Sequence, residues 1–320
     1  MNRLPVAVLV AACCMAPAAQ AQGYPVKPIR LVVPYSPGGP NDTIGRIFAQ
    51  RLAEAIGQQV IVDNRAGGGG NIGTEYVAKA APDGYTLLSA GMGSTVINPL
   101  IGKVTYDPER DFVPIMLVAT APNVLAVHPS TGVATVAELI TLARQQPGKL
   151  NAASSGLGSS THLSAALFES LAGIRITHIP YKGSAPSMTA LLSGEVEMSF
   201  LGVPNVLPHW RSGKLRVLAV ATKRRSTQIP DVPTIAESGL PDYEVNAWYG
   251  IAAPTGTPAA IVNRLHAEMM KFVNTPVYRD ALAAQGAEPV SSTPEEFAAV
   301  LRTDKANWTR ILKELGIRGE

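Results

Sequence analysis

Tyr35, Pro37, Gly38, Gly39 and Asp42 lie within a few positions of one another, in a segment where paired glycines stand between prolines. An apolar run precedes this segment and a helical pattern follows it, so the sequence predicts a loop that opens a helix. Paired glycines leave backbone N–H groups accessible, and a helix start carries partial positive charge. We therefore expect an anion to bind here. The alternative is a tight turn in which Asn41 or Asp42 only caps the helix.

Two further polar segments follow predicted strands. Met92, Ser94 and Thr95 come after the predicted strand at residues 85–89. In the second half of the chain, Gly158, Ser159, Ser160 and His162 come after the predicted strand at residues 150–153. Open sheets bind ligands at the carboxyl ends of parallel strands, and Ser and Thr hydroxyls donate hydrogen bonds without adding bulk. Both segments predict contacts to a carboxylate, with an ordinary loop or cap as the alternative.

Three more residues complete the predicted site. Lys182 and Ser184 follow the predicted strand at residues 176–179, where the lysine could pair with a second carboxylate of the ligand or could be a solvated surface residue. Glu197 stands just before the predicted strand at residues 198–200 and could orient a bound water molecule or amino group. A surface position is the alternative for this glutamate.

Gly68, Gly70 and Gly73 match the spacing of a dinucleotide-binding turn. The match is weak, because it follows the second predicted strand and because no acidic residue closes the next strand to hold a ribose hydroxyl. A flexible turn with a close helix approach, or a second helix start that faces an anion, explains these glycines better. No cofactor is expected.

Catalytic and metal-binding patterns are absent from the sequence. It has no G-x-S-x-G, H-E-x-x-H or P-loop lysine, and its five histidines lack metal-ligand spacing. We expect neither catalysis nor a metal. An enzyme that uses His162 as a base and a serine as nucleophile is the alternative. The formal charge is only +3, and the one basic cluster, Lys223 to Arg225, does not predict nucleic-acid binding.

Short apolar runs alternate with helical patterns along the chain, which is typical of an α/β fold. The predicted strands that carry the loops described above occupy residues 29–33, 60–62, 85–89, 124–127, 150–153, 176–179, 198–200 and 215–221. A helix with buried Ile44, Phe48 and Leu52 is expected to end at Gly57, and Thr135 with Glu138 forms the pattern of a capping box. Helices are also expected around residues 261–272 and 297–315.

The arrangement of these elements predicts two lobes. Residues 112–120 and 243–253 are apolar stretches that can serve as two strands crossing between the lobes, and two crossings make a hinge. We assign residues 22–120 and 248–320 to lobe 1 and residues 121–247 to lobe 2. The helices at the end of the chain then pack back on lobe 1.

The first residues predict export. Arg3 is followed by an apolar run of about 12 residues, too short to span a bilayer, and by Ala19-Gln20-Ala21, which resembles a signal-peptidase site. Residues 1–21 are therefore predicted to be a signal peptide. Both cysteines fall within it, so the mature chain would contain none. An alternative is a lipoprotein in which Cys13 is acylated.

The sequence resembles the Bug-type periplasmic substrate-binding proteins of tripartite tricarboxylate transporters. The motifs that carry this resemblance are Tyr24-Pro25, Pro34-Tyr35-Ser36-Pro37-Gly38-Gly39, Asn64-Arg65, Pro82-Asp83-Gly84-Tyr85, Asn98-Pro99, Tyr181-Lys182-Gly183, Gly213-Lys214-Leu215-Arg216, Pro230-Asp231-Val232-Pro233-Thr234 and Pro254-Thr255-Gly256-Thr257-Pro258. The sequence departs from the usual family pattern at Glu197, Leu201 and Gly202. These departures affect the distal half of the predicted pocket.

The resemblance implies a two-lobed type II periplasmic-binding-protein fold. It also implies a monomer that captures a small carboxylate, which could be a di- or tricarboxylate, an aromatic carboxylate or an amino acid. The expected partners are that ligand and the membrane subunits of a tripartite tricarboxylate transporter. A sensory module that presents the ligand to a receptor is the alternative role.

Overall fold

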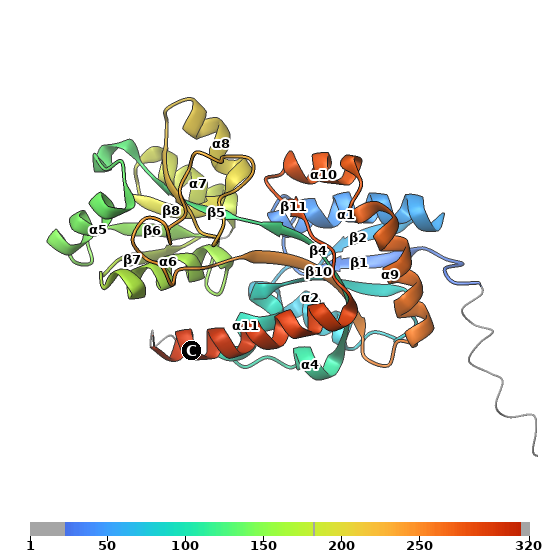
Figure 1. The fold of residues 1–320 in the computed structure, drawn as a ribbon. Coiled ribbons are helices and arrows are strands. Elements are labelled where there is room, and N and C mark those ends of the chain that lie inside the picture. Colours follow the sequence, from blue (N-terminus) through green and yellow to red (C-terminus); the bar gives the residue numbers. More distant parts are fainter. Residues whose placement is uncertain (1–22, 182, 315–320) are drawn as a thin grey trace, which may run out of the picture.

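The computed structural model describes residues 23–181 and 183–314, in which two β-sheets are each flanked by helices (Figure 1). We call the part built on the six-stranded sheet lobe 1 and the part built on the five-stranded sheet lobe 2. The predicted signal peptide, Cys13 and Lys182 lie outside the described residues.

Lobe 1 has the strand order β11-β4-β10-β3-β1-β2. Its strands are β1 (Ile29–Val33), β2 (Val60–Asn64), β3 (Thr86–Gly91), β4 (Phe112–Ala121), β10 (Ala247–Pro254) and β11 (Glu288–Pro289). Its helices are α1 (Pro40–Ile56), the 3-10 turn η1 (Gly68–Gly70), α2 (Asn71–Ala78), the π-helical turn η2 (Gly93–Ile97), α3 (Asn98–Ile101), α4 (Pro108–Asp111), α9 (Ala259–Val273), α10 (Pro276–Ala283) and α11 (Pro294–Glu314). Strands β1, β2 and β3 are parallel, so the loops that follow them share one edge.

Lobe 2 has the strand order β7-β6-β8-β5-β9. Its strands are β5 (Asn123–Val127), β6 (Asn151–Ser154), β7 (Thr177–Pro180), β8 (Met198–Gly202) and β9 (Arg216–Val220). Its helices are the 3-10 turn η3 (Pro129–Thr131), α5 (Val136–Gln145), α6 (Ser160–Ala172), α7 (Ser184–Ser193) and α8 (Val203–Arg211). Strand β6 is parallel to β7 and β8, whereas β5 is antiparallel to β8 and β9.

The two lobes are joined by the two predicted crossings. Strand β4 continues through Pro122 into β5, and the chain returns to lobe 1 in β10, which pairs antiparallel with β4 (Figure 1). Trp248 of β10 lies opposite Thr120, and its indole N–H donates to Asp304 of α11 at 2.7 Å. The Trp248 ring also packs edge-on against Phe297 of α11. Helix α11 therefore supports the crossing point.

The hydrophobic core extends through the crossing. One cluster of buried residues includes Val96 and Leu117 of lobe 1 together with Leu125 and Phe200 of lobe 2. A second cluster consists of lobe 1 residues alone, and a third consists of lobe 2 residues alone. Because burial of apolar surface is the main stabilising term in folding, the shared cluster couples the stability of the two lobes.

Helix α1 forms where the sequence predicts it. Ile44, Phe48 and Leu52 are buried on one face, and the helix ends at Gly57, whose φ of 68° is a left-handed conformation suited to glycine. The N–H group of Gly57 donates to the Ala53 carbonyl and closes the last turn. This helix start carries the Gly38-Gly39 loop.

Several boundaries differ from the prediction. All predicted strands except β10 begin and end within two residues of the expected positions. Strand β10 begins at Ala247, so residues 243–246 precede it. Helices α3, α4, α7, α8 and α10 were not predicted. Helix α8 contains Pro208 in its interior, and proline usually interrupts a helical pattern because it lacks an N–H donor.

Candidate functional site

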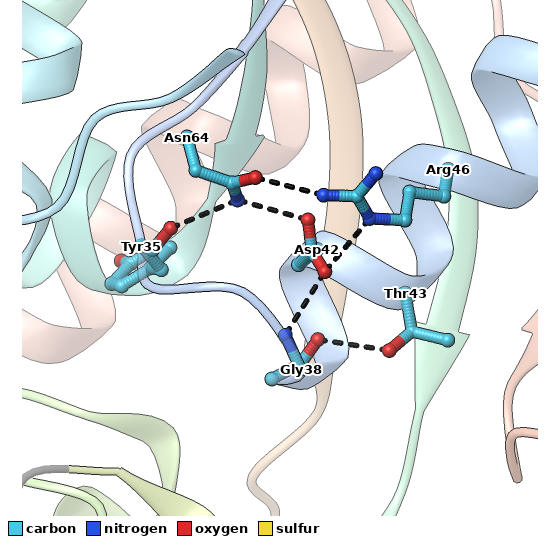
Figure 2. Close-up of polar contacts among 7 residues, drawn as sticks. Tyr35, Gly38, Asp42, Thr43, Arg46 and Asn64 are labelled. Carbon is cyan, nitrogen blue, oxygen red and sulfur yellow. Dashed lines mark hydrogen bonds and ion pairs between the residues drawn. The ribbon is translucent and has the colours of Figure 1, made fainter. Parts of the chain in front are cut away.

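Asp42 organises the loop between β1 and α1 (residues 34–39), as Figure 2 shows. Its carboxylate accepts hydrogen bonds from the Gly38 N–H group at 2.9 Å, from Arg46 Nε at 3.0 Å and from Asn64 Nδ2 at 2.8 Å. Only 3% of Asp42 is exposed. Burial by itself raises the pKa of Asp42, but these donors together lower it below its usual value. Asp42 is therefore a buried, ionised residue whose oxygens are occupied by donors of its own chain.

Asn64 extends this network to the start of the loop. Its Nδ2 also donates to the Tyr35 carbonyl at 3.1 Å, and its Oδ1 accepts from Arg46 Nη2 at 2.9 Å (Figure 2). The loop backbone is thus held at Tyr35 and at Gly38. Asn64 was not among the predicted site residues, although the Asn64-Arg65 pair is one of the motifs of the family resemblance.

The structure corrects the proposed capping role of Asp42. The N-cap position of α1 is Gly39, which makes no side-chain cap, and Asp42 lies in the first turn and reaches back to Gly38. The positive φ of the loop, 87°, belongs to Gly38, whereas Gly39 is extended with φ −82° and ψ 167°. Gly38 is therefore the residue at which the turn itself requires glycine.

Backbone N–H groups remain available at this helix start. Among hydrogen bonds within residues 23–181 and 183–314, none uses the N–H groups of Gly39, Asn41 or Asp42. The first N–H groups of an α-helix have no partner within the helix and are a common site for anions. Pro37 and Gly38 are exposed beside them. The predicted anion-binding loop thus has donors, with the Gly38 N–H group as the exception because Asp42 already uses it.

The residues after β3 are more buried than predicted. Met92 is part of the hydrophobic core, and the Thr95 hydroxyl donates to the Gly91 carbonyl at 2.9 Å. Ser94 is fully buried, and its Oγ has no hydrogen-bond partner within the described residues. A Cβ atom placed on Gly93 would lie 2.9 Å from the Tyr35 hydroxyl, so Tyr35 reaches this turn from the β1–α1 loop.

The loop between β6 and α6 (residues 155–159) forms the corresponding part of lobe 2. Ser159 is the N-cap of α6: its Oγ accepts from the His162 N–H group at 3.3 Å and donates to the Gly156 carbonyl at 2.6 Å. Ser160 accepts a hydrogen bond from Asn123 at 3.3 Å. The N–H groups of Ser160 and Thr161 make no hydrogen bond within the described chain. A second helix start with available donors therefore lies in lobe 2.

The His162 side chain stabilises this loop through a hydrogen bond to its backbone. Its Nδ1 accepts from the Gly158 N–H group at 3.2 Å, and its ring stacks on His178 with ring centroids 4.1 Å apart. His178 Nε2 in turn contacts the Ser154 hydroxyl at 2.6 Å. Burial first, and the neighbouring His178 second, lower the pKa of His162 from 6.5 to about 4. His162 is neutral at neutral pH, as an acceptor at Nδ1 must be.

Protein stability is expected to fall as the pH decreases from 6.5 to about 4. The unfolded chain binds a proton at His162 more readily than the folded chain, so the stabilisation is complete above pH 6.5 and is lost toward the lowered pKa. The total effect is about 3 kcal/mol. Urea unfolding of the wild type and of His162→Phe, which cannot be protonated, measures it. Parallel pH profiles for the two proteins would contradict this explanation.

Ser184 and Glu197 occupy different positions relative to this loop. Ser184, the first residue of α7, has its hydroxyl 3.0 Å from that of Ser155, so the two lobe 2 loops meet. Glu197 instead accepts hydrogen bonds from the backbone and side chain of Asn151, at the amino end of β6. That is the opposite end of the sheet from the loops, so the predicted ligand contact of Glu197 does not fit its position. Glu197 is not part of the site proposed below.

The glycines after β2 pack against the protein itself. A Cβ on Gly70 would lie 3.0 Å from the Tyr35 ring, and a Cβ on Gly73 would lie 2.7 Å from both the Arg65 carbonyl and the Pro34 Cα. These glycines allow η1 and α2 to approach the end of β1 closely. The close-approach interpretation explains them, and the space next to Gly70 is filled by Tyr35 and Ser94.

The loops of the two lobes meet at Gly158. A Cβ on Gly93 would lie 3.5 Å from the Gly158 carbonyl oxygen, and a Cβ on Gly158 would lie 2.7 Å from Asn98 Oδ1. Tyr35, Gly93 and Gly158 are therefore neighbours, although they come from three loops. Asn98 was not predicted as a site residue. Its only signal in the sequence was the Asn98-Pro99 motif of the family resemblance.

No group of three His, Cys, Asp or Glu side chains in residues 23–181 and 183–314 is arranged to hold a metal ion. A membrane-spanning helix is also absent from that part of the chain, because none of its helices is both long and apolar enough.

Two α/β lobes joined by two crossing strands are also the fold of the similar periplasmic binding proteins of known structure. The family model "Tripartite tricarboxylate transporter family receptor" matches residues 44–317. The chain therefore belongs to this receptor family, which confirms the predicted fold class and the resemblance to Bug-type proteins.

Relatives with related sequences support this assignment. BugT of Bordetella pertussis is 37% identical over 315 residues, which cover 98% of this chain and 97% of BugT. The structure of R. palustris Rpa4515 with adipate has 39% identity and a TM-score of 0.87, with 93% of this chain and 100% of that chain covered. MatC of Rhodopseudomonas palustris with bound malate has 31% identity and a TM-score of 0.82, with 90% and 100% covered.

Proposed function

We propose that this protein captures a small carboxylate between its two lobes and delivers it to the membrane subunits of a tripartite tricarboxylate transporter. The observation that carries the proposal is the pair of helix starts, α1 in lobe 1 and α6 in lobe 2, both with N–H groups that no residue of the described chain uses. Their loops meet through Tyr35, Gly93 and Gly158. Donors from both lobes suit a ligand with two anionic or polar ends.

The proposed site assigns different roles to the predicted residues. The N–H groups of Gly39, Asn41 and Asp42 bind one carboxylate, beside Pro37 and Gly38. Tyr35 and Ser94 lie at the base, and the α6 start at Ser159 and Ser160 binds the other end together with Ser184 and Lys182. The Asp42 side chain and His162 position the two loops without contacting the ligand. Met92 and Thr95 support the turn that contains Ser94.

The ligand class follows from this donor set. Backbone N–H groups recognise a carboxylate without regard to the rest of the molecule, so a dicarboxylate, tricarboxylate, aromatic carboxylate or amino acid fits the proposal. Relatives with bound adipate and malate favour a dicarboxylate.

We further propose that the protein acts as a monomer in the periplasm after removal of residues 1–21. Lobe 1 would comprise residues 22–120 and 248–320, and lobe 2 residues 121–247. The similar structures of a periplasmic transporter and of the periplasmic binding protein BugD support this location.

We also propose that the protein does no chemistry on its ligand. In the enzyme alternative His162 would activate a serine, but His162 Nδ1 accepts from the Gly158 backbone and its ring stacks on His178. Ser154, which contacts His178, is fully buried. Ser130, whose hydroxyl lies 2.7 Å from His128 Nδ1, is in η3 at the end of the lobe 2 sheet opposite the proposed site. A nucleophile needs both access to the substrate and an oriented base.

Incubation with adipate or malate is expected to give binding without a product. Calorimetry should show saturable binding to the mature protein, with a Kd in the micromolar range, or about −8 kcal/mol. Hexane-1,6-diol, which has the chain length of adipate without its charges, should not bind. Mass spectrometry of the ligand after long incubation with equimolar protein tests turnover. A stoichiometric new product would establish an enzyme, and equal binding of the diol would exclude the carboxylate site.

A further inference from the structure

Gly158 of lobe 2 fits into a corner of lobe 1 that has no room for a side chain. A Cβ atom at Gly158 would lie 2.7 Å from Asn98 Oδ1, 3.5 Å from Ile101 Cδ1 and 3.8 Å from Ile97 Cγ2. Carbon and oxygen atoms that are not bonded do not approach to 2.7 Å without displacement of one of them. The hydrogen atom of glycine is therefore the largest substituent that this arrangement of the lobes accepts.

Lobe 1 holds Asn98 in place without help from lobe 2. Asn98 Nδ2 donates to the Gly69 carbonyl and to Asn71 Oδ1, both at 2.8 Å, and Asn71 Oδ1 also accepts from the Tyr106 hydroxyl at 2.9 Å. Rotation of the Asn98 amide would break two hydrogen bonds of a side chain that is 7% exposed. Its Oδ1 is consequently directed toward Gly158 by contacts within lobe 1.

Lobe 2 holds Gly158 equally firmly. Its φ of 72° is left-handed, and its N–H group donates to His162 Nδ1. Its carbonyl oxygen faces Gly93 of lobe 1, where a Cβ would come within 3.5 Å. Two preformed surfaces thus meet through glycine at one point, next to the loops of the proposed ligand site.

We propose that Asn98 is a positioning residue whose contact with Gly158 sets how far the two lobes close. The inference rests on the proposed function only in that closure traps the ligand. Ligand that touches both lobes has its full affinity in the closed state, so a change that disfavours closure lowers the apparent affinity by the same factor. Asn98 then controls affinity without touching the ligand.

Gly158→Ala tests the contact, and Gly148→Ala is the matched control. Gly148 also lies in lobe 2 and has the same φ of 72°, but nothing lies within 4 Å of a Cβ placed there. Both variants carry the same left-handed strain, so they should lose similar thermal stability. Only Gly158→Ala adds a methyl group between the lobes.

Lobe separation is measured between spin labels at Thr141→Cys on α5 and Val277→Cys on α10, which are exposed and lie on different lobes (Figure 1). Labelling is specific in the mature chain, because the only cysteines of the sequence are Cys13 and Cys14. Gly158→Ala should lengthen the label distance in the adipate-saturated protein and raise the Kd for adipate at least tenfold. Gly148→Ala should leave both unchanged.

Asn98→Ala added to Gly158→Ala decides the role of Asn98. Removal of Oδ1 makes room for the methyl group, so the double variant should recover the label distance and a Kd within about threefold of that of Asn98→Ala alone. No recovery would show that Asn98 does not limit closure. A Gly158→Ala protein that behaves like Gly148→Ala in distance and Kd would overturn the proposal entirely.

The ligand-free label distance separates this inference from the proposed function. If the wild type binds no carboxylate, the proposed function fails. The closure contact is then tested by the label distances without ligand. Gly158→Ala should shift these distances to longer values, and Gly148→Ala should not. The structure, in which Gly158 lies against Asn98, corresponds to a short distance between the two labels. If the wild type never shows this short label distance, with or without adipate, the closure contact would also be overturned.

Discussion

Asp42→Ala is expected to lower the free energy of unfolding by about 3 kcal/mol, because it leaves buried hydrogen-bond donors at the start of α1 without an acceptor. The substitution removes the acceptor for the Gly38 N–H group, for Arg46 Nε and for Asn64 Nδ2. Arg46 is half exposed and can turn to solvent, but Gly38 and Asn64 lose the group that sets the loop. Chemical unfolding at neutral pH measures the loss.

Asp63→Ala is the matched control for this experiment. Asp63 in the adjacent strand also pairs with two arginines, Arg30 and Arg65, but it is partly exposed. Such surface pairs contribute at most about 1 kcal/mol. Equal losses for the two variants would contradict the special role of Asp42.

The pH dependence gives a second test of Asp42. Burial raises its pKa, and the donors around it outweigh burial and lower the pKa below the usual value. The stabilisation by Asp42 is therefore present above the unfolded-state pKa of about 4 and is lost as the pH falls through the lowered native pKa. The stability difference between wild type and Asp42→Ala should shrink over that range. A difference that stays constant in acid would exclude the ionised carboxylate as its source.

Gly39→Val is expected to abolish carboxylate binding while the protein stays folded. Gly39 is extended, so valine needs no left-handed backbone, and the closest atom to a Cβ placed there is the Ser36 carbonyl oxygen at 3.9 Å. The branched side chain fits the protein but stands beside the N–H groups at the α1 start. Loss of about two charge-assisted hydrogen bonds would weaken binding on the order of a hundredfold or more. A valine at Gly38 would not give a clear test, because the φ of 87° at that position would add backbone strain to any loss of binding.

Gly102→Val controls for the effect of valine at an extended glycine. Gly102 follows α3 in lobe 1 with φ −147° and ψ 173°, and its nearest neighbour for a Cβ is the Asn98 carbonyl oxygen at 3.7 Å. Calorimetry with adipate and thermal unfolding should show normal stability for both variants and normal binding only for Gly102→Val. Unchanged affinity in a folded Gly39→Val protein would show that the loop is only a turn.

Recognition by backbone donors, as proposed for this site, would allow one fold to bind different carboxylates. The N–H groups at a helix start are set by the fold and do not change when side chains change. The Rpa4515 and MatC structures, with adipate and malate, keep TM-scores of 0.87 and 0.82 to this chain. In the proposed site the choice among carboxylates therefore depends on the side chains and water between the two helix starts, not on the carboxylate contacts themselves.

The local elements could be predicted because their signals are local. The buried face of α1 with Gly57 after it, and the Thr135 cap of α5, follow from residue spacing, and both are present. Helix α8 was missed because Pro208 breaks the pattern, and packing against β5, β8 and β9 outweighs this local cost.

The sequence by itself determined the α/β class, the two crossings and the loops from which an anion site could be built, since hydrophobic period and glycine placement are properties of short segments. Only the tertiary structure decided which atoms of those loops are available. Asp42 takes the Gly38 N–H group, His162 takes that of Gly158, and Glu197 lies at the far end of the lobe 2 sheet. The physical reason is that hydrogen-bond partners such as Asn64 with Asp42, and contacts such as Asn98 with Gly158, join residues distant in sequence. No local pattern encodes these pairings, because each depends on how the strands pair and the lobes meet.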